Sequence, residues 1–302
     1  MPELPEVESL RRSLVPYIQG KKINSVEVIL PKLVSGRGTK RVVNQAMADS
    51  FVNNISRKIV TGLTRRAKNI IFTFDDNSVM VVHLKMTGQL VFKPFQAVGK
   101  VTLISGGHPI ELSTSELPNK HSYIIFYFEN GTLFYNDVRQ FGYLLHFSSL
   151  EEAINDGHFA KLGFEPLDDS FILKNFEVGL KRKTGNLKKV LLDQEIVVGL
   201  GNIYADEVCF MAKVRPNRLV KTLSKKEIKS LYEAINKIIP RAIELGGSSI
   251  ADYLLADGSR GNYAREHKVY GRAGKECLVC GTILTKTVSG GRTTVYCKKC
   301  QK

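Results

Sequence analysis

Residues 277–300 read CLVCGTILTKTVSGGRTTVYCKKC, in which two Cys-x-x-Cys pairs are separated by sixteen residues. Four thiolates at this spacing can surround a zinc ion tetrahedrally and leave no open position, which makes such a site structural. Disulfide bonds or free thiols are the alternatives, but the paired spacing favours one structural Zn2+ in a reducing compartment. The predicted ligands are Cys277, Cys280, Cys297 and Cys300.

The hairpin that this zinc ion would hold is also basic. Residues 255–302 contain ten lysines and arginines in total but only three acidic residues. A zinc-pinned hairpin of this charge can present Arg292 to the phosphates of DNA. The alternative is that the zinc site only stabilises the fold of the hairpin and that its charged face contacts only water.

The region before this hairpin is predicted to be helical, because apolar residues recur there every three to four positions. Cys209 has apolar neighbours in this region, and we expect it in a protein core rather than at the metal. Within GLGNIYADE, residues 199–207, we expect a tight turn that begins a helix, whose N–H groups together with Asn202 can hold a phosphate. The expected helices span 171–180, 187–194, 203–213 and 224–245.

The first half of the chain is predicted to be rich in β-structure. Runs of β-branched and aromatic residues alternate with turn sequences such as DDNS and ENG, which is typical of an antiparallel sandwich or barrel. An apolar stripe over residues 4–18 predicts a helix that Pro16 should bend or end. Residues 95–121 are rich in Gly, Ser and Pro, and we expect a long loop there. The expected strands span 23–30, 69–74, 79–84, 122–128, 132–135 and 143–147.

The composition changes from strand-like to helical segments near residue 150. The sequence therefore predicts an α+β protein of two domains, the second of which carries the zinc finger. We expect an N-terminal β-sandwich domain with an N-terminal helix at 1–150, a helical domain at 151–265, and the finger at 266–302.

The whole chain has an excess of basic residues. Its 302 residues carry a formal charge of +15 at pH 7, so we expect a polyanionic partner, with a merely soluble basic surface as the alternative. The N-terminus shows no signal peptide, and no apolar run is long enough to span a bilayer. We therefore expect a cytoplasmic protein without membrane contact.

The N-terminal sequence MPELPEVE, residues 1–8, places a proline directly after methionine. Removal of Met1 would leave Pro2 with a free secondary amine, and an α-amino group with a pKa of about 8 is partly neutral at pH 7. Such an amine can attack a sugar C1′ or a carbonyl carbon to give an iminium ion. Glu3 beside it can move protons. The alternative is that Pro and Glu merely begin a helix.

Several motifs together resemble one family. They occur in the order that they take in formamidopyrimidine-DNA glycosylase (Fpg, or MutM), and the resemblance covers residues 2–301. The related endonuclease VIII branch typically opens with Pro-Glu-Gly-Pro-Glu, so Leu4 favours the purine-directed branch. The motifs are PELPEVE (2–8), RRAK (65–68), HLKMTG (83–88), DVRQFG (137–142), LLDQ…VVGLGNIYADE (191–207), VYGRAG (269–274) and the finger ending GGRTTVYCKKCQK.

The resemblance implies a bifunctional DNA glycosylase and abasic-site lyase of base excision repair. Such an enzyme removes 8-oxoguanine and formamidopyrimidines through a Schiff base on Pro2 and cuts the strand by β,δ-elimination. It would bind double-stranded DNA with a damaged base or abasic site as a monomer at the bacterial nucleoid. The implied fold is a β-sandwich catalytic domain, a helix–two-turn–helix domain and a zinc finger. Two alternatives remain: the same chemistry directed at oxidised pyrimidines, as in endonuclease VIII, or a non-catalytic zinc-ribbon DNA-binding protein.

The resemblance also implies roles for residues near the reacting sugar. Pro2 matches the family's nucleophile, and Glu3 matches the general acid and base. Glu6 matches a residue that supports that helix end. Lys68 matches a lysine on the phosphate beside the lesion, and His83 resembles a further phosphate contact.

Other positions match residues that hold the bent DNA. Met86, Arg139 and Phe141 match three side chains that fill the gap left by the flipped nucleotide and probe the opposite base. Without the resemblance, core packing would explain Met86 and Phe141 equally well. The residues that match phosphate contacts in the second half of the chain are Asn202, Tyr270 and Arg292.

Overall fold

The computed structural model describes residues 1–38, 41–95, 104–107, 117–157, 159–248 and 261–302. The chain divides into two units. The N-terminal unit contains residues 1–2, residues 6–160 and the described part of 246–261. The C-terminal unit contains residues 3–5, 161–245 and 262–302.

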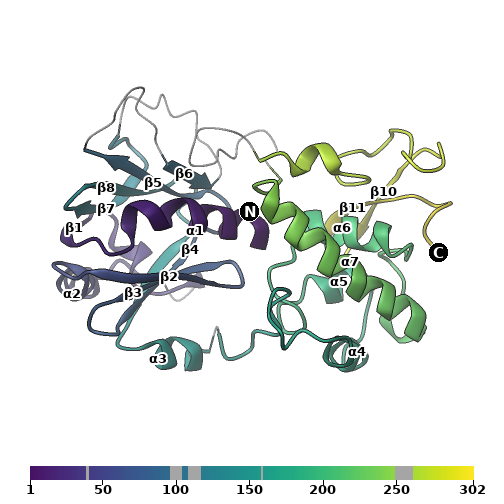
Figure 1. Cartoon of the computed structure of the whole chain (residues 1–302), viewed down its shortest axis with the longest axis horizontal. Coiled ribbons are helices and arrows are strands. Elements are labelled where there is room, and N and C mark those ends of the chain that lie inside the picture. The colour runs from purple at the N-terminus through teal and green to yellow at the C-terminus, as the bar shows by residue number, and fades with distance from the viewer. Residues whose placement is uncertain (39–40, 96–103, 108–116, 158, 249–260) are drawn as a thin grey trace. The chain divides into compact units, whose positions relative to one another are not determined.

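Two antiparallel sheets form the N-terminal unit (Figure 1). Their strands are β1 (Ile23–Val28), β2 (Val60–Arg66), β3 (Asn69–Phe74), β4 (Val79–His83), β5 (Gly88–Pro94), β6 (Ile104–Gly107), β7 (Ser122–Phe128), β8 (Gly131–Asp137) and β9 (Tyr143–Phe147). One sheet has the order β1-β7-β8-β5-β6, and the other has the order β2-β3-β4-β9. Of the two predicted architectures, the structure has the sandwich.

The first helix, α1 (Leu4–Ile18), packs its apolar stripe into the core of this unit. Leu10 and Leu14 share one cluster of buried side chains with Phe72 of β3 and Phe126 of β7. Burying a side chain of this kind stabilises the fold by about 1.5–3 kcal/mol. The helix therefore closes the core against both sheets, with strands from each in contact with the same buried cluster.

The ends of α1 depart from the simple stripe that the sequence predicted. Leu4 is buried in the core of the C-terminal unit, so the first turn of the helix belongs to that unit. The helix also continues past Pro16 to Ile18. A proline near the last turn removes one hydrogen bond, and in this helix it does not end the structure at that point.

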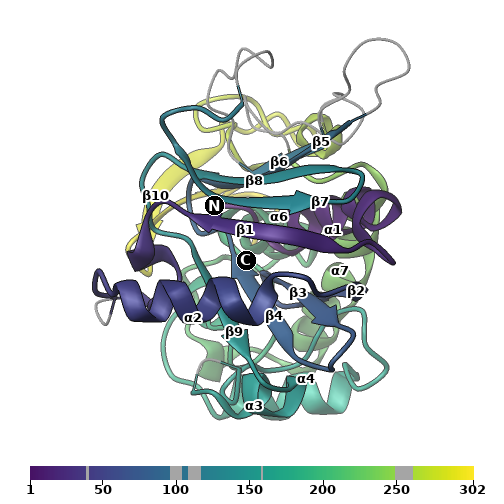
Figure 2. The same cartoon turned by 90° about the vertical axis from the view of Figure 1, so that its left-hand side faces the viewer.

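Five described helices and strands were not expected from the sequence: α2 (Gln45–Ile55), α3 (Leu150–Asn155), β2, β5 and β6. The second helix contacts β1 and β9, the edge strands of the two sheets (Figure 2). It buries three side chains, Ala48, Phe51 and Ile55. Three apolar positions are too few to predict a helix from the period of the sequence. Within the predicted 95–121 loop, β6 pairs with β5. Residues 96–103 and 108–116 of that loop lie outside the described part.

The C-terminal unit is helical and ends in a hairpin. Its elements are α4 (Leu173–Lys181), α5 (Leu187–Leu191), α6 (Asn202–Met211), α7 (Lys225–Glu244), β10 (Thr285–Ser289) and β11 (Arg292–Tyr296). The four predicted helices are confirmed with shifts of a few residues. Cys209 is completely buried in the core of this unit, as expected. Among the described residues, no helix is long and apolar enough to cross a membrane.

Candidate functional site

The carboxylate of Glu3 caps the helix that follows the GLGN turn. Its Oε2 accepts the N–H of Gly201 at 2.7 Å and that of Tyr204 at 3.4 Å, and its Oε1 accepts the N–H of Ile203 at 2.9 Å. Gly201 provides α6 with no capping side chain of its own. N–H groups at a helix start lack partners within the helix, and the dipole there favours a negative charge. Glu3 therefore supplies the missing cap.

Two glycines of this turn leave room for the N-terminal residues. A Cβ at Gly201 would lie 2.4 Å from the carboxyl carbon of Glu3, and a Cβ at Gly199 would lie 2.4 Å from Cβ of Leu4. Gly199 also has a φ of +85°, a conformation that favours glycine. The N–H of Leu4 donates to the carbonyl of Gly199 at 3.0 Å. Because Pro2 directly precedes Glu3, these contacts fix the backbone next to the predicted nucleophile.

The N–H groups at the start of α6 do not offer a phosphate the open site that the sequence suggested. Three of them donate to Glu3. Asn202 instead lies beside another predicted site residue, Tyr270: burial raises the pKa of that hydroxyl, and the side chain of Asn202 acts in the opposite direction. Its Oδ1 is buried and has no hydrogen-bond partner within the described ranges. The structure thus brings Asn202 and Tyr270 together, and a phosphate contact here would use their side chains.

Glu6 holds the turn at Gly247 and Ser248. Its side chain is buried, and Oε1 accepts the N–H of Ser248 at 2.7 Å. A Cβ at Gly247 would lie 2.7 Å from this oxygen, and the φ of Gly247 is +82°. The position therefore requires glycine both for its conformation and for the close approach of Glu6.

Lys68 and His83 lie near each other at one end of the four-stranded sheet. Lys68 is in the turn between β2 and β3, and Asn69, the next residue, is the register partner of His83. The Nδ1 of His83 accepts the N–H of Lys85 at 3.0 Å. The imidazole packs on the ring of Tyr143, with centroids 5.4 Å apart. The structure thus brings Lys68 and His83 to the same end of this sheet and buries both side chains.

Met86, Arg139 and Phe141 lie on two loops that Thr87 joins. The first loop connects β4 with β5, the second connects β8 with β9, and β5 pairs with β8. The hydroxyl of Thr87 donates to Asp137 and accepts the N–H of Arg139 at 3.0 Å. The guanidinium of Arg139 lies 4.6 Å from the ring centroid of Phe141, and both side chains are exposed. The predicted DNA probes therefore form one group on linked loops.

The completely buried carboxylate of Asp137 holds the second of these loops. One of its oxygens accepts the hydroxyl of Thr87. The other accepts the N–H of Gly142 at 2.7 Å and the hydroxyl of Tyr135 at 3.4 Å. A Cβ at Gly142 would lie 1.7 Å from the Tyr135 oxygen, and one at Gly88 would lie 2.7 Å from it. Both loops therefore need glycine where they pass this tyrosine.

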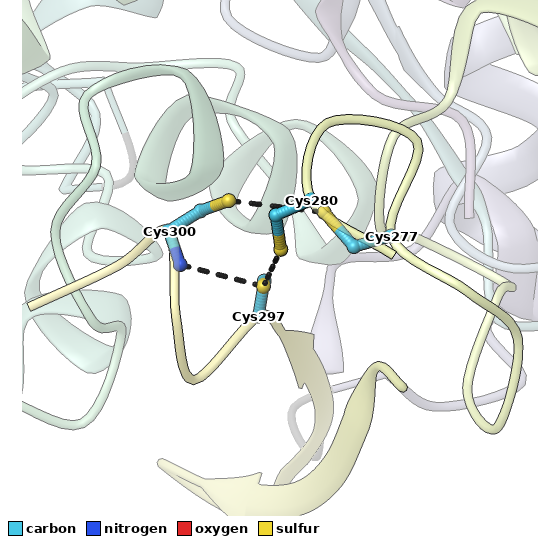
Figure 3. Close-up of side chains that lie close together, drawn as sticks. All are labelled: Cys277, Cys280, Cys297 and Cys300. Atoms are coloured by element: carbon cyan, nitrogen blue, oxygen red, sulfur yellow. Dashed lines mark hydrogen bonds between the residues drawn. The ribbon is translucent and has the colours of Figure 1, made fainter. Parts of the chain in front are cut away.

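The four finger cysteines point toward one another from two segments (Figure 3). Their Sγ atoms all lie within 4.8 Å of one another. Sγ of Cys277 and Cys300 are 3.9 Å apart, and those of Cys280 and Cys297 are 3.4 Å apart. Tetrahedral zinc with Zn–S bonds of about 2.3 Å requires sulfurs about 3.8 Å apart. The four residues therefore fit one structural zinc ion.

A buried ion pair holds the strand that begins with Arg292. Nζ of Lys188 on α5 lies 2.7 Å from Oδ1 of Asp206 on α6, and both side chains are fully buried. Nζ also donates to the carbonyl of Thr293 at 2.8 Å, while Oδ2 of Asp206 accepts the N–H of Val295 at 3.1 Å. The pair thus offers the edge of β11 one donor and one acceptor, as a neighbouring strand would.

Glu207, the next residue of α6, holds the segment before the finger. Its carboxylate accepts three consecutive N–H groups, from Lys268 at 2.9 Å, Val269 at 3.0 Å and Tyr270 at 2.8 Å. Burial raises the pKa of Glu207, and these hydrogen bonds act in the opposite direction. One face of α6 therefore anchors the backbone of Tyr270.

The sequence alone indicates no role for five residues that orient the site: Thr87, Asp137, Lys188, Asp206 and Glu207. A signal for two of them was present, because Asp206 and Glu207 stand within an otherwise apolar run on a predicted buried helix. Acidic residues are almost never fully buried unless they are paired, so this run implied specific partners. Apart from Lys188, these partners lie 61 to 89 residues further along the chain and could not be identified from spacing.

Three family models match the chain. The formamidopyrimidine-DNA glycosylase N-terminal domain matches residues 1–144, and the H2TH domain of the same family matches residues 162–253. The zinc finger found in FPG and IleRS matches residues 274–302. The formamidopyrimidine-DNA glycosylase of Listeria monocytogenes is 37% identical over 303 residues, which cover 100% of both chains.

Solved structures with bound DNA are also similar. The complex between the Lactococcus lactis Fpg and DNA containing an abasic site matches with a TM-score of 0.83, 33% identity and coverage of 99% of each chain. A structure of MutM in complex with DNA containing carbocyclic 8-oxo-G matches with a TM-score of 0.82, 34% identity and full coverage of both chains.

We predict one Zn2+ per chain, and we predict that Cys297→Ser loses it. Loss of the metal should weaken DNA binding more than it lowers the melting temperature of the whole chain, because the finger is a small terminal element with a metal-dependent fold. Metal analysis of chelator-washed protein and a binding titration test this. Cys209→Ser is the matched control and should retain one zinc ion. Active protein that contains almost no metal would contradict the prediction.

Proposed function

The chain belongs to the formamidopyrimidine-DNA glycosylase family, and we propose that it removes oxidised purines from double-stranded DNA with the amine of Pro2 as its nucleophile. One observation carries the assignment of this residue. Glu3, which follows Pro2, is fixed by three N–H groups of the GLGN turn and α6. A non-catalytic zinc-ribbon protein gives no reason for such an anchored carboxylate beside the chain terminus.

The proposed reaction begins when the amine of Pro2 attacks C1′ of the damaged nucleotide. A nitrogen–carbon bond forms, the glycosidic bond breaks, and the base leaves with the bonding electrons and takes up a proton. Opening of the sugar ring converts the new bond into an iminium ion. The iminium makes the C2′ proton acidic, and its removal expels the 3′ phosphate by β-elimination; δ-elimination then expels the 5′ phosphate.

Glu3 is proposed to move protons at the sugar. Its carboxylate is buried, and its two oxygens are oriented by backbone donors rather than by flexible side chains. A general acid or base contributes about 10²–10⁴-fold when it is held in the reacting geometry. The cap on α6 therefore provides a fixed direction for this group without further ordering during the reaction.

The remaining predicted residues are proposed to hold the DNA. Extrusion of a nucleotide costs a few kcal/mol, which an inserted side chain such as Met86 or Phe141 can partly offset. Arg139 is exposed beside Phe141 and has fork-like donors suited to the unpaired base. Lys68 and His83 are proposed to contact phosphates in the N-terminal unit. Asn202, Tyr270 and Arg292 are proposed to do so in the C-terminal unit.

We also propose the domain division and the location of the protein. The ranges 1–150, 151–265 and 266–302 each enclose one matched family segment completely. The Listeria relative is bacterial, and four cysteines at metal-ligand spacing fit a reducing compartment. We therefore propose a cytoplasmic protein that associates with the nucleoid while it acts on DNA.

If Pro2 is the nucleophile, borohydride should reduce the iminium ion on abasic-site DNA to a stable cross-link at residue 2. Acetylation of the N-terminal amine should abolish the cross-link, because the amide nitrogen is no longer nucleophilic. Glu3→Gln should lower base excision by roughly 10²-fold or more and affect cleavage of abasic DNA less. Peptide mapping and gel assays measure these effects. Full trapping by acetylated protein would show that another residue attacks.

Arg139 and Arg292 should differ in what they recognise. Arg292→Ala should weaken binding to damaged and undamaged duplexes alike and lower the salt slope by about 1, because a phosphate contact reads no sequence. Arg139→Ala should change discrimination between cytosine and adenine opposite the lesion, at about 1–3 kcal/mol per base contact. Titrations at several salt concentrations measure both. Uniform weakening by Arg139→Ala, with altered preference in Arg292→Ala, would mean that the two roles are reversed.

A further inference from the structure

Glu8 on α1 gathers three arginines around one buried carboxylate. Its side chain is 8% exposed. Oε1 accepts from Nη2 of Arg11 at 2.7 Å and from Nε of Arg12 at 2.7 Å. Oε2 accepts from Nε of Arg11 at 3.0 Å and from Nε of Arg65 at 3.3 Å. The arginines hold the pKa of Glu8 at about 2 although burial acts to raise it, so the carboxylate is charged at neutral pH.

Of the three arginines, Arg65 reaches the turn that carries Lys68. Its side chain is 7% exposed, and Nη1 donates to the carbonyl of Ala67 at 2.9 Å. Arg66 and Asn69 are register partners, so Ala67 and Lys68 are the two residues of the hairpin turn between β2 and β3. Glu8 is therefore connected to this turn through a single guanidinium.

The turn needs an external support because Ala67 has a φ of +53°. A residue with a Cβ in this left-handed region costs roughly 1–2 kcal/mol relative to the ordinary helical conformation. Within the hairpin, Nδ2 of Asn69 donates to the carbonyl of Arg66 at 3.1 Å. The carbonyl of Ala67 itself is held by Arg65, and Arg65 is oriented by Glu8.

We propose that Glu8 is a positioning residue for Lys68, which it orients by holding Arg65 against the carbonyl of Ala67. This inference rests on the proposed phosphate contact of Lys68. Glu8 lies on the helix that begins directly after Pro2 and Glu3. One helix thus connects the predicted nucleophile with the turn that presents the phosphate-binding lysine. If the turn were displaced, Lys68 would keep its charge, but its ammonium group would no longer be positioned at the phosphate. This would weaken DNA binding at the lesion more than it would lower the stability of the fold.

The test is a double-mutant cycle of Glu8→Gln and Lys68→Ala on abasic-site DNA. Glu8→Gln keeps the shape of the side chain and removes its charge, and it should lower kcat/KM by roughly 10- to 100-fold, because misplacement of about 1 Å can cost that much. The salt slope of binding should fall by about 1 in either single variant. The double variant should be no worse than Lys68→Ala alone, because coupled residues do not add.

Arg12→Ala is the matched control, because it removes another guanidinium from the same carboxylate without touching the link to Ala67. It should retain the wild-type kcat/KM and salt slope. If Glu8→Gln does not fold, Arg65→Lys breaks the same link, leaves Glu8 paired with Arg11 and Arg12, and should reproduce the predicted loss.

Two results would contradict different parts of the proposal, the positioning role of Glu8 and the phosphate contact of Lys68. Additive losses in the double variant, or an equal loss in Arg12→Ala, would show that Glu8 does not act through Lys68. If Lys68→Ala alone changes neither kcat/KM nor the salt slope, the proposed phosphate contact of Lys68 is wrong, and the positioning role fails with it. The melting temperatures of all variants separate these effects from loss of the fold.

Discussion

Three main-chain N–H groups at the start of α6 hold the carboxylate of Glu3, and the order of the proposed catalytic N-terminus depends on them. A hydrogen bond to a charged group contributes about 1.5–3 kcal/mol, and a helix cap of the ordinary kind about 0.5–2 kcal/mol. The interaction therefore has enough free energy to order a chain end that would otherwise fray. It also explains why glycine stands at position 201, where a Cβ would meet the carboxyl group of Glu3.

Buried charges elsewhere in the molecule act in the same way, by holding backbone that lacks partners of its own. Lys188 and Asp206 satisfy the free edge of β11, and Glu207 receives three consecutive N–H groups before the finger. Glu8, through Arg65, holds the hairpin turn at Ala67. A buried ion pair adds little net stability, because desolvation offsets most of the attraction. In this protein, these buried charged groups fix the segments that carry Tyr270, Arg292 and Lys68.

Much of the local structure could be predicted from the sequence. Runs of β-branched and aromatic residues between turn sequences predicted β3, β7 and β9 with their observed bounds. The cysteine spacing alone predicted the zinc ligands. The elements that were missed, such as α2, bury too few side chains to produce a clear period.

The contacts that orient the site were not predictable in this way. Glu3 and Gly201 lie 198 residues apart, and nothing in their local sequence identifies one as the partner of the other. The suggestion that α6 offers its N–H groups to a phosphate did not anticipate that three of them donate to Glu3. The donors were read correctly from the turn, but their acceptor is a side chain from the other end of the chain.

The most direct test of the anchored N-terminus is the rate of 8-oxoguanine excision by Gly201→Ala. The backbone at Gly201 (φ −131°) accepts alanine, so the added Cβ acts mainly on Glu3. Excision should fall by roughly 10²-fold, while zinc content and affinity for undamaged DNA stay at wild-type values. Gly62→Ala, whose Cβ would make only ordinary contacts with Thr73, should keep the full rate. A wild-type rate in Gly201→Ala would contradict the claim that the cap on α6 holds the proposed catalytic carboxylate of Glu3 in place.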